Sequence, residues 1–421
     1  MLDINLIREN PDKVKRGIEK KKADPKLVDK FLRVDEEWRT KVKALDELKA
    51  EQNELSKELA KERKEDLISR AQLLKQRIGD IEAERGTLET KRDEILNKIP
   101  NIPFEDVLIG KDENGNKVIR EWGEKPKFSA EDGFKSKDYL SLGEKLGLID
   151  VKKAAEVSGS RFGYLMNEAA LMEFGLVQLA FKILLEEGFI PVVPPVMIKS
   201  DVFAGMGKLV GEQKEDKYYL PKDDLYLVGS AEHTLGPLQM NEVFEGKDLP
   251  RRYVGFSTCF RREAGSYGKD TKGILRVHQF DKVEMFSFSK PEDSEKEHQF
   301  LVSLQEKLMQ KLELPYRVVE ICTGDMDWVG ARQFDIETWL PGQNEYRETH
   351  SCSNTADFQT RGINVKYKTA EGKKEFTHAL NGTAFAIGRT IISILENYQT
   401  KEGKVRVPKA LQDYVGKKEI G

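Results

Sequence analysis

Long apolar runs are absent from this 421-residue sequence, and neither sign of charge dominates it. No stretch approaches the roughly 20 apolar residues that a membrane-spanning helix needs, and the first residues lack the apolar core of a secretory signal peptide. Charged residues make up 34% of the chain, and the mean hydropathy is -0.58. We therefore expect a cytoplasmic protein with an extended polar element and no membrane partner.

Cysteine is scarce as well. Cys259, Cys322 and Cys352 are an odd number of widely spaced residues without a C-x-x-C pair. Such a set encodes neither a disulfide framework nor a standard zinc site. We expect buried, reduced thiols at these positions.

A large excess of basic residues, which is common in nucleic-acid-binding proteins, is also missing, because the formal net charge is -3. Residues 1–100 hold 25 Lys and Arg against 23 Asp and Glu, so the N-terminal part is only slightly basic. An RNA partner would have to contact local patches, such as Lys13, Lys15, Arg16, Lys20, Lys21 and Lys22. A solvated helix face explains this patch equally well.

A heptad pattern occupies residues 31–99. Apolar residues recur there in alternating steps of three and four, as in helices that pair in a coiled coil. The first seam is Phe31, Val34, Trp38, Leu45, Leu48, Gln52, Leu55 and Leu59, and the second is Leu67, Ala71, Leu74, Ile78, Ile81, Arg85, Leu88, Arg92, Ile95 and Ile99. The charged break at 61–66 predicts a tip between two helices of about 35 residues, which form an antiparallel rod of roughly 50 Å. Dimerisation is the ordinary role of such seams, but the break favours a hairpin within one chain.

The length of the chain predicts more than one domain, because one ordinary core does not extend over so many residues. Residues 100–160 are interpreted as a connector that contains several prolines, and a second body is expected to begin near Tyr139. Residues 165–185 predict a helix, and residues 188–195 predict a helix stop, a strand and a proline turn.

The most informative segment is residues 259–284. Cys-Phe-Arg-Arg-Glu-Ala-Gly-Ser and Arg-Val-His-Gln-Phe-Asp-Lys-Val-Glu predict its two strands, and the expected turn residues are Gly265, Ser266, Gly268, Asp270 and Gly273. Residues two or four apart on a strand share a face, which predicts one face with Arg261, Glu263, Phe280 and Glu284. A guanidinium, two carboxylates and an aromatic ring suit ATP and an amine. Taken alone, Arg-Arg-Glu is more often a solvated ion pair.

This segment is similar to motif 2 of the class II aminoacyl-tRNA synthetases and closely resembles the seryl-tRNA synthetase form. The resemblance implies an α+β fold, with an N-terminal antiparallel coiled-coil arm in residues 1–103 and a catalytic domain in residues 104–421. Helices would flank an antiparallel sheet in that domain. Residues 165–195 resemble motif 1, which builds a homodimer interface in the family. Residues 378–397 resemble motif 3, a strand that runs into a helix.

The resemblance also implies the residues of the site. The segment 227–232 resembles a loop that closes over serine, with Ser230 in place of the family's Thr, and the implied serine-binding residues are Ser230, Ala231, Glu232, Glu284, Asn381 and Thr383. The segment 347–354 resembles a strand that holds phosphates and Mg²⁺, with Glu348 and Ser351 as the implied metal ligands. The implied ATP-binding residues are Arg261, Arg262, Glu263, Val277, Phe280, Glu348, Thr349, His350, Ser351 and Arg389. Of these, Arg261, Glu348 and Arg389 are the implied catalytic residues, and His350 is expected not to be a catalytic base.

The implied reaction is the ATP-dependent activation of L-serine to seryl-adenylate, followed by transfer to the 3′ end of tRNA(Ser), with tRNA(Sec) as an open second acceptor. ATP and Mg²⁺ would be required, and the arm would contact the tRNA by shape and backbone. Two alternatives stay open. A ligase that aminoacylates a carrier protein would lack the arm, and an inactive RNA-binding paralogue would have lost Arg261, Glu284 or Arg389.

Overall fold

The protein is described by a computed structural model that covers residues 1–62, 64–128, 134–210, 212–263 and 272–421. Its contacts divide the chain into two units, residues 2–100 and residues 101–421, with Met1 grouped with the second unit. The boundary expected from the sequence lies slightly further along the chain, at 103/104. Four of the predicted turn residues, Gly265, Ser266, Gly268 and Asp270, lie outside the described residues.

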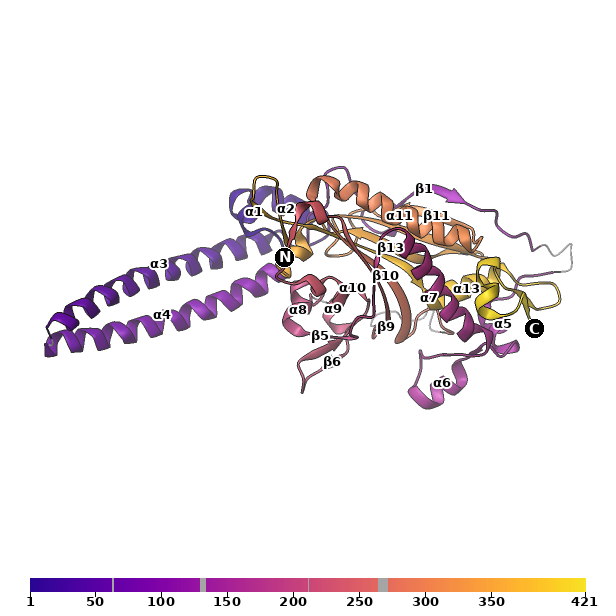
Figure 1. Cartoon of the computed structure of the whole chain (residues 1–421), viewed down its shortest axis with the longest axis horizontal. Helices are drawn as coiled ribbons and strands as arrows, with labels where there is room; N and C mark the ends of the chain where they lie inside the picture. Colours follow the sequence, from indigo (N-terminus) through magenta and orange to yellow (C-terminus); the bar gives the residue numbers. More distant parts are fainter. Residues whose placement is uncertain (63, 129–133, 211, 264–271) are drawn as a thin grey trace. The chain divides into compact units, whose positions relative to one another are not determined.

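Two long helices dominate residues 2–100. Helix α3 (Lys26–Lys61) and helix α4 (Glu65–Asn97) run side by side as an antiparallel pair, and two short helices, α1 (Ile4–Glu9) and α2 (Pro11–Glu19), precede them (Figure 1). Buried leucines and an isoleucine of the two seams form one apolar cluster: Leu45, Leu48, Leu55, Leu74 and Ile78. The predicted coiled-coil hairpin within one chain is therefore confirmed.

Polar side chains complete the pairing of α3 with α4. The Nζ atom of Lys49 lies 2.8 Å from Glu82 Oε1, and Arg70 Nη2 lies 3.0 Å from Glu51 Oε1. The Arg92 guanidinium lies 4.2 Å from the centre of the Trp38 ring, a cation–π contact. An arginine at a seam position is thus compatible with the pair, because it covers an aromatic residue of the facing helix.

Residues 101–421 are built on an eight-stranded sheet with the strand order β1-β11-β12-β13-β16-β10-β9-β4. Neighbouring strands are antiparallel except β4 and β9, which are parallel. The strands are β1 (Lys117–Trp122), β4 (Ile190–Val192), β9 (Arg251–Phe260), β10 (Gln279–Ser289), β11 (Tyr316–Glu320), β12 (Arg332–Leu340), β13 (Glu345–Asn354) and β16 (His378–Ala386).

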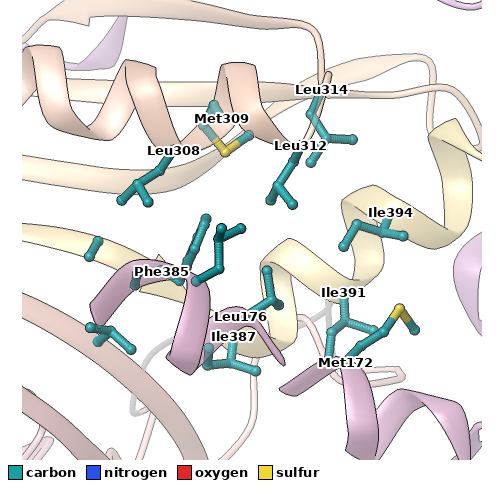
Figure 2. Packing of buried hydrophobic residues seen from close by; sticks show 14 of the residues in the cluster. Met172, Leu176, Leu308, Met309, Leu312, Leu314, Phe385, Ile387, Ile391 and Ile394 are labelled. Atoms are coloured by element: carbon teal, nitrogen blue, oxygen red, sulfur yellow. The ribbon is translucent and has the colours of Figure 1, made fainter. Parts of the chain in front are cut away.

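Three helices pack against this sheet and against one another: α7 (Glu168–Glu186), α11 (Ser294–Lys311) and α13 (Ile387–Asn397). Figure 2 shows Leu176 of α7, Leu308 of α11 and Ile391 of α13 converging near Phe385, at the end of β16. The resulting core is continuous, and an antiparallel sheet flanked by helices confirms the predicted α+β class. The strand β16 runs directly into α13, as the third motif predicts.

Shorter elements surround the large sheet. The helices are α5 (Tyr139–Lys145), α6 (Val151–Ser158), α8 (Ser200–Gly205), α9 (Glu212–Glu215), α10 (Glu232–Leu235), α12 (Phe358–Gly362) and α14 (Gln412–Val415). Two small sheets have two strands each: β2 (Ile149–Asp150) pairs with β3 (Tyr164–Leu165), and β17 (Val405–Arg406) pairs with β18 (Glu419–Ile420). In a third sheet, β7 (Leu225–Leu227) lies between β5 (Met197–Lys199) and β6 (Tyr219–Leu220). In a fourth, β14 (Lys366–Lys368) lies between β8 (Val243–Glu245) and β15 (Lys374–Phe376).

Two expectations from the sequence are wrong. The segment 100–160 is more than a connector, because β1 forms an edge of the large sheet; all six residues of β1 are exposed, so no apolar alternation reveals the strand. The strand β9 ends at Phe260, so Arg261 and Glu263 lie beyond it, and Glu263 has a left-handed backbone with φ of 52°.

Two further expectations concern cysteines and membrane spans. The three cysteines are unpaired and buried, as expected. Within the described ranges, the helices are too short or too polar to cross a membrane.

Candidate active site

The register of three central strands brings predicted site residues together. Glu284 of β10 pairs with Thr383 of β16, and Asn381 of β16 pairs with Ser353 of β13. Because side chains two residues apart on a strand point the same way, Lys282 lies beside Glu284 and Asn381 lies beside Thr383. These strands therefore present their polar side chains to one cleft.

A β-bulge in β13 decides which of its residues face that cleft. Ile336 pairs with His350 and Glu337 pairs with Glu348, so Thr349 is an extra residue in β13. In a regular strand, residues three apart point to opposite faces, but one extra residue restores the same face. Glu348 and Ser351 consequently both line the cleft, as predicted from their family positions.

The cleft has two parts that share Arg261, Lys282, Glu348, Ser351 and Thr383. The larger part has a volume of about 320 Å³, and its other lining residues are Lys208, Asp216, Lys217, Ser230, Glu232, His233, Glu284, Asp327, Ser353 and Asn381. The smaller part has a volume of about 140 Å³, and its other lining residues are Glu263, Ile274, Leu275, Arg276, Val277, Phe280, Thr349, Ala386, Gly388 and Arg389.

Glu284 is 2% exposed in the larger part. Its Oε2 atom lies 2.8 Å from Lys282 Nζ and accepts a hydrogen bond of 3.2 Å from Thr383 Oγ1. Burial raises the pKa of this carboxyl, and the nearby Lys282 ammonium opposes that rise. A buried carboxylate held by defined partners is a strong site for a ligand's ammonium group.

Glu232, the first residue of α10, is also buried in the larger part. Its Oε1 atom lies 3.0 Å from Lys208 Nζ, and the same Nζ lies 2.7 Å from Asp327 Oδ2. Two carboxylates that come from distant segments of the chain therefore share one ammonium group.

Asn381 keeps an unused donor in the larger part. The residue is 6% exposed, and its Nδ2 atom has no hydrogen-bond partner in the part of the chain that is described. Because buried side-chain amides are nearly always hydrogen-bonded, this donor points to a ligand. Ser230 lies nearby, and its Oγ accepts a 3.3 Å hydrogen bond from Glu232 N. The side chain of Ala231 packs into the apolar core instead.

Arg261 and Arg389 supply positive charge to the smaller part. Two guanidinium nitrogens of Arg261 donate to Gly229 O at 3.1 Å. Arg389, near the start of α13, donates to Glu348 O at 2.8 Å and lies 3.3 Å from Glu348 Oε2. Desolvation acts to raise the pKa of Glu348, but Arg389 and Arg261 outweigh it and hold this pKa below its usual value.

The predicted adenine-side residues are partly assembled. Phe280, Glu263 and Val277 line the smaller part, and the Phe280 ring centre lies 5.3 Å from the Arg261 guanidinium. Arg262 is exposed, donates to Lys217 O at 3.0 Å and lies over the Tyr218 ring. The geometry gives no support to an ATP contact by the Arg262 side chain.

His350 does not face the cleft. The residue is 1% exposed, and its ring nitrogens lie 2.9 Å from Thr349 Oγ1 and 3.0 Å from Ala384 O. Burial lowers its pKa to about 4, so the enclosed ring is neutral, in agreement with the expectation of no catalytic base. The bulge turns this side chain to the other face, so the structure does not bring it together with the other predicted ATP-binding residues. Thr349 borders the smaller part, but its hydroxyl is bonded to Thr338 Oγ1 at 2.8 Å.

Comparison with protein families decides the family. Residues 1–103 match the seryl-tRNA synthetase N-terminal domain, and residues 217–398 match the tRNA synthetase class II core domain (G, H, P, S and T). A curated protein, the serine–tRNA ligase of Pyrococcus horikoshii, is 44% identical, with 100% of this chain and 97% of the relative covered. The chain belongs to the seryl-tRNA synthetase family.

Solved structures of the family share the fold. The crystal structure of seryl-tRNA synthetase from P. horikoshii complexed with ATP has a TM-score of 0.89 and 44% identity, covering 100% of this chain and 99% of that chain. The cytoplasmic serine–tRNA ligase from Naegleria fowleri in complex with AMP has a TM-score of 0.84 and 36% identity, covering 100% and 98%. The likeness to family members therefore extends over both units of the chain.

Motif reasoning for this seryl-tRNA synthetase family member missed several charged residues of the cleft, namely Lys208, Asp216, Lys217, Lys282 and Asp327. A signal existed for Lys282, since it lies two residues before Glu284 on a predicted strand and so shares its face. Lys208 and Asp327 come from segments far from the motifs, and no spacing rule connects them with Glu232.

A separate cavity of about 290 Å³ adjoins the smaller part of the cleft and shares Phe280, Val277, Ile274 and Gly388 with it. Glu173 of the motif 1 helix α7 and Asp281 of β10 both line this cavity. Burial, the hydrogen bond to Asp281 and the negative charge of Asp281 raise the pKa of Glu173 to about 8. The two carboxyl groups therefore share a proton near neutral pH.

Glu173 predicts a pH dependence of stability. A carboxyl whose pKa is raised in the folded state stabilises the fold below its unfolded pKa, and this contribution is lost as the pH rises through the folded value of about 8. The melting temperature of the wild type should therefore fall between pH 6 and 9 relative to that of Glu173→Gln. The amide of this variant stays neutral and can still donate to Asp281. Parallel melting temperatures of the two proteins over this range would contradict the shared proton.

Proposed function

We propose that this chain activates L-serine with ATP and transfers the seryl group to tRNA(Ser). The observation that carries the proposal is one cleft in which the acidic residues Glu284 and Glu232 adjoin the cationic residues Arg261 and Arg389. An ammonium group suits the acidic part, and a triphosphate suits the cationic part. Membership of the seryl-tRNA synthetase family supports the same reaction.

In the first step, a carboxylate oxygen of serine attacks the α-phosphorus of ATP, and the bond from that phosphorus to the bridging oxygen of pyrophosphate breaks. Glu284 binds the serine ammonium, and Asn381, Thr383 and Ser230 complete the serine pocket. Their contacts hold the carboxylate in line with the phosphorus, so orientation supplies a large share of the rate. The step needs no covalent bond between the enzyme and serine.

Charges of the smaller part bind the nucleotide. Arg261 stabilises the negative charge that develops on the α-phosphate, and Arg389 meets the γ-phosphate near the start of α13, where the helix dipole also attracts anions. Phe280 stacks on adenine, and Glu263 accepts a hydrogen bond from the adenine amino group. A preorganised donor to developing charge, such as Arg261, commonly contributes about 10²- to 10³-fold to the rate.

Glu348 and Ser351 fit a magnesium ion. Both lie on the cleft face of β13, and the Glu348 carboxyl stays ionised because the adjacent arginines hold its pKa low. Mg²⁺ prefers oxygen ligands and usually keeps several waters or phosphate oxygens beside one or two protein ligands. The ion, when bound here, would offset the charge of the phosphates.

In the second step, a terminal ribose hydroxyl of the tRNA attacks the carbonyl carbon of seryl-adenylate. A ribose ester forms, the bond from that carbon to the phosphate oxygen breaks, AMP leaves and the hydroxyl proton is released. The α3–α4 arm contacts the tRNA away from this reaction, through shape and backbone. The match of residues 1–103 to the seryl-tRNA synthetase N-terminal domain favours tRNA as the acceptor over a carrier protein. A cytoplasmic location stays a prediction.

Glu284→Gln tests the serine pocket. Loss of the charge that pairs with the serine ammonium should raise the serine KM by about 10- to 100-fold, the value of a hydrogen bond to a charged group, with little change in the ATP KM. Serine-dependent ATP–pyrophosphate exchange measures both constants. Glu371→Gln, the same change at an exposed position, is the control. Absence of exchange by the unmutated chain with every amino acid would contradict the proposed function.

Shortening the arm tests its role. Lys41 and Glu84 form an ion pair across the α3–α4 pair, so removal of residues 42–83 with a short glycine linker shortens both helices in register. The shortened arm should lose its contacts with the tRNA backbone. The kcat/KM for tRNA charging should then fall at least about 10-fold, because backbone contacts supply much of the affinity for nucleic acid. Exchange should be unchanged, and an equal loss of both activities would refute a role of the arm in tRNA binding.

The outer face of α7 supports a homodimer. Leu171 and Phe174 on this helix are 45% and 60% exposed, and Val193, after the adjacent β4, is 85% exposed. Large exposed apolar side chains on one helix and on the segment after a strand that contacts it favour an interaction surface. A second copy of the chain is the proposed partner, since α7 and β4 correspond to motif 1.

Phe174→Glu tests the homodimer. A charge in an apolar interface is costly, so the variant should shift the molar mass measured by light scattering toward the 48.1 kDa monomer. Val157→Glu adds the same charge to an exposed apolar position on α6 and should leave the mass unchanged. A monomeric unmutated chain would refute the proposed dimer.

A further inference from the structure

A continuous series of polar contacts joins Glu232, in the larger part of the cleft, to Ser351, which lines both parts. It begins at Glu232, whose Oε1 lies 3.0 Å from Lys208 Nζ, and continues to Asp327, whose Oδ2 lies 2.7 Å from the same Nζ. The backbone N–H of Asp327 donates to Gln333 Oε1 at 3.1 Å. The Gln333 Nε2 atom donates to Ser351 Oγ at 3.2 Å. These five residues are called the polar connection below.

Gln333 is the central member of the polar connection. The residue is 9% exposed, and it is not among the residues that line the cleft, so it lies behind the cleft wall. Its oxygen faces a backbone donor, and its nitrogen donates to both Ser351 Oγ and Asp335 Oδ1, the latter at 2.9 Å. An amide with partners at both ends has one favourable orientation. The position of Gln333 therefore depends on Asp327 at one end and fixes Ser351 at the other.

Ser351 is held from behind the cleft wall and lines the cleft itself. Its hydroxyl oxygen accepts a hydrogen bond from Gln333 Nε2, and the buried Asp335 carboxyl interacts with the same hydroxyl. These two contacts restrict the rotation of the Ser351 side chain. Gln333 and Asp335 together aim the oxygen that is proposed as a magnesium ligand.

Lys208 holds the other end of the polar connection, in the larger part of the cleft. Its side chain is 13% exposed and lies between two carboxylates, one on the serine loop and one on the segment that leads to β12. Without this ammonium, Asp327 and Glu232 would be partly buried charges of the same sign, and such groups move apart or toward water. A displacement of Asp327 would remove the hydrogen bond that orients Gln333.

We infer that Lys208 and Gln333 are positioning residues that hold the serine loop and the metal-binding hydroxyl of Ser351 in one arrangement. The inference rests on the proposed function, because there Ser351 is a ligand of the magnesium ion. Binding free energies at two connected sites are reciprocal, so a ligand that orders Glu232 also favours metal-nucleotide binding at Ser351.

A double-mutant cycle tests this inference. The variants are Lys208→Met, Gln333→Met and the double variant, and the measurement is the Kd of Mn²⁺ with α,β-methylene-ATP in the absence of serine. Calorimetry gives the Kd of the nucleotide, and the EPR signal of Mn²⁺ gives the bound metal. This nucleotide keeps a carbon at the bond that activation breaks, so no reaction interferes.

Gln333→Met should raise the Kd about 10-fold, because a residue that orients a metal ligand typically contributes 10- to 100-fold to affinity. Lys208→Met should raise it about 3-fold or more, although Lys208 contacts neither Ser351 nor Glu348. Since both changes break the same connection, the double variant should be no weaker than the Gln333→Met variant within about 2-fold.

Lys307→Met is the matched control. Lys307 does not line the cleft, and its Nζ lies 2.6 Å from Glu187 Oε1, so the variant also removes a lysine–carboxylate ion pair while it leaves the polar connection intact. This control should change the Kd by less than about 2-fold. Thermal unfolding verifies that each variant is folded. If Gln333→Met does not fold, Gln333→Glu takes its place, because it keeps the acceptor for Asp327 N and lacks the amide donor.

Two results would overturn the inference while leaving the proposed function intact. The first is a double variant whose Kd rises by the product of the two single fold-changes, and the second is equal weakening of binding by Lys208→Met and Lys307→Met. Failure of the unmutated chain to bind Mn²⁺ with the nucleotide at all would instead overturn the proposed function together with the inference.

Discussion

The cleft depends on one electrostatic requirement, which is that a carboxylate removed from water needs a cation close to it. Glu284 meets this requirement with Lys282, and Glu232 meets it with Lys208. Both acids are thus compensated by lysines of the chain before any ligand arrives. The pocket keeps its shape for this reason, and a pocket that is already ordered loses less conformational entropy when it binds.

The large sheet separates the chemistry from the packing. On one face, β10, β13 and β16 present polar side chains to the cleft, and against the sheet α7, α11 and α13 form a continuous apolar core (Figure 2). Rigid strands determine the spacing of the polar side chains, because the register of an antiparallel pair cannot slip without exposing the core. Loops then add the remaining members, such as Glu232, whose positions are secured by ion pairs.

The parts of the fold with a repeated pattern could be predicted from the sequence. The α3–α4 pair was predictable because its heptads extend over many turns, and the strand-to-helix motif at β16 and α13 was implied by the resemblance of residues 378–397 to motif 3. The strand β1 could not be predicted, since its six residues are all exposed and pair only with a neighbour that is distant in sequence. Local periodicity carries no information about such a pairing.

The residues of the site also divide into those that a local motif predicts and those that only the folded chain brings together. Glu284, Thr383 and Arg389 lie in the cleft as predicted, because each is placed by a recognisable motif. Lys208 and Asp327 were missed, since their relation to Glu232 exists only after the chain has folded. His350 was included among the ATP-binding residues because its segment resembles a family strand, and the extra residue in β13 turns its side chain away from the cleft.

That extra residue, Thr349, divides β13 into two segments of opposite phase. The loss or gain of one residue between Glu348 and Ser351 would turn one of these two oxygens to the face that packs against helices. The turn at 341–344, between β12 and β13, has no such constraint, because its length does not alter the phase of the strand that follows. Along this hairpin, the number of residues between the two oxygens is therefore restricted by the phase of the strand, whereas a change in the length of the turn leaves that phase unaltered.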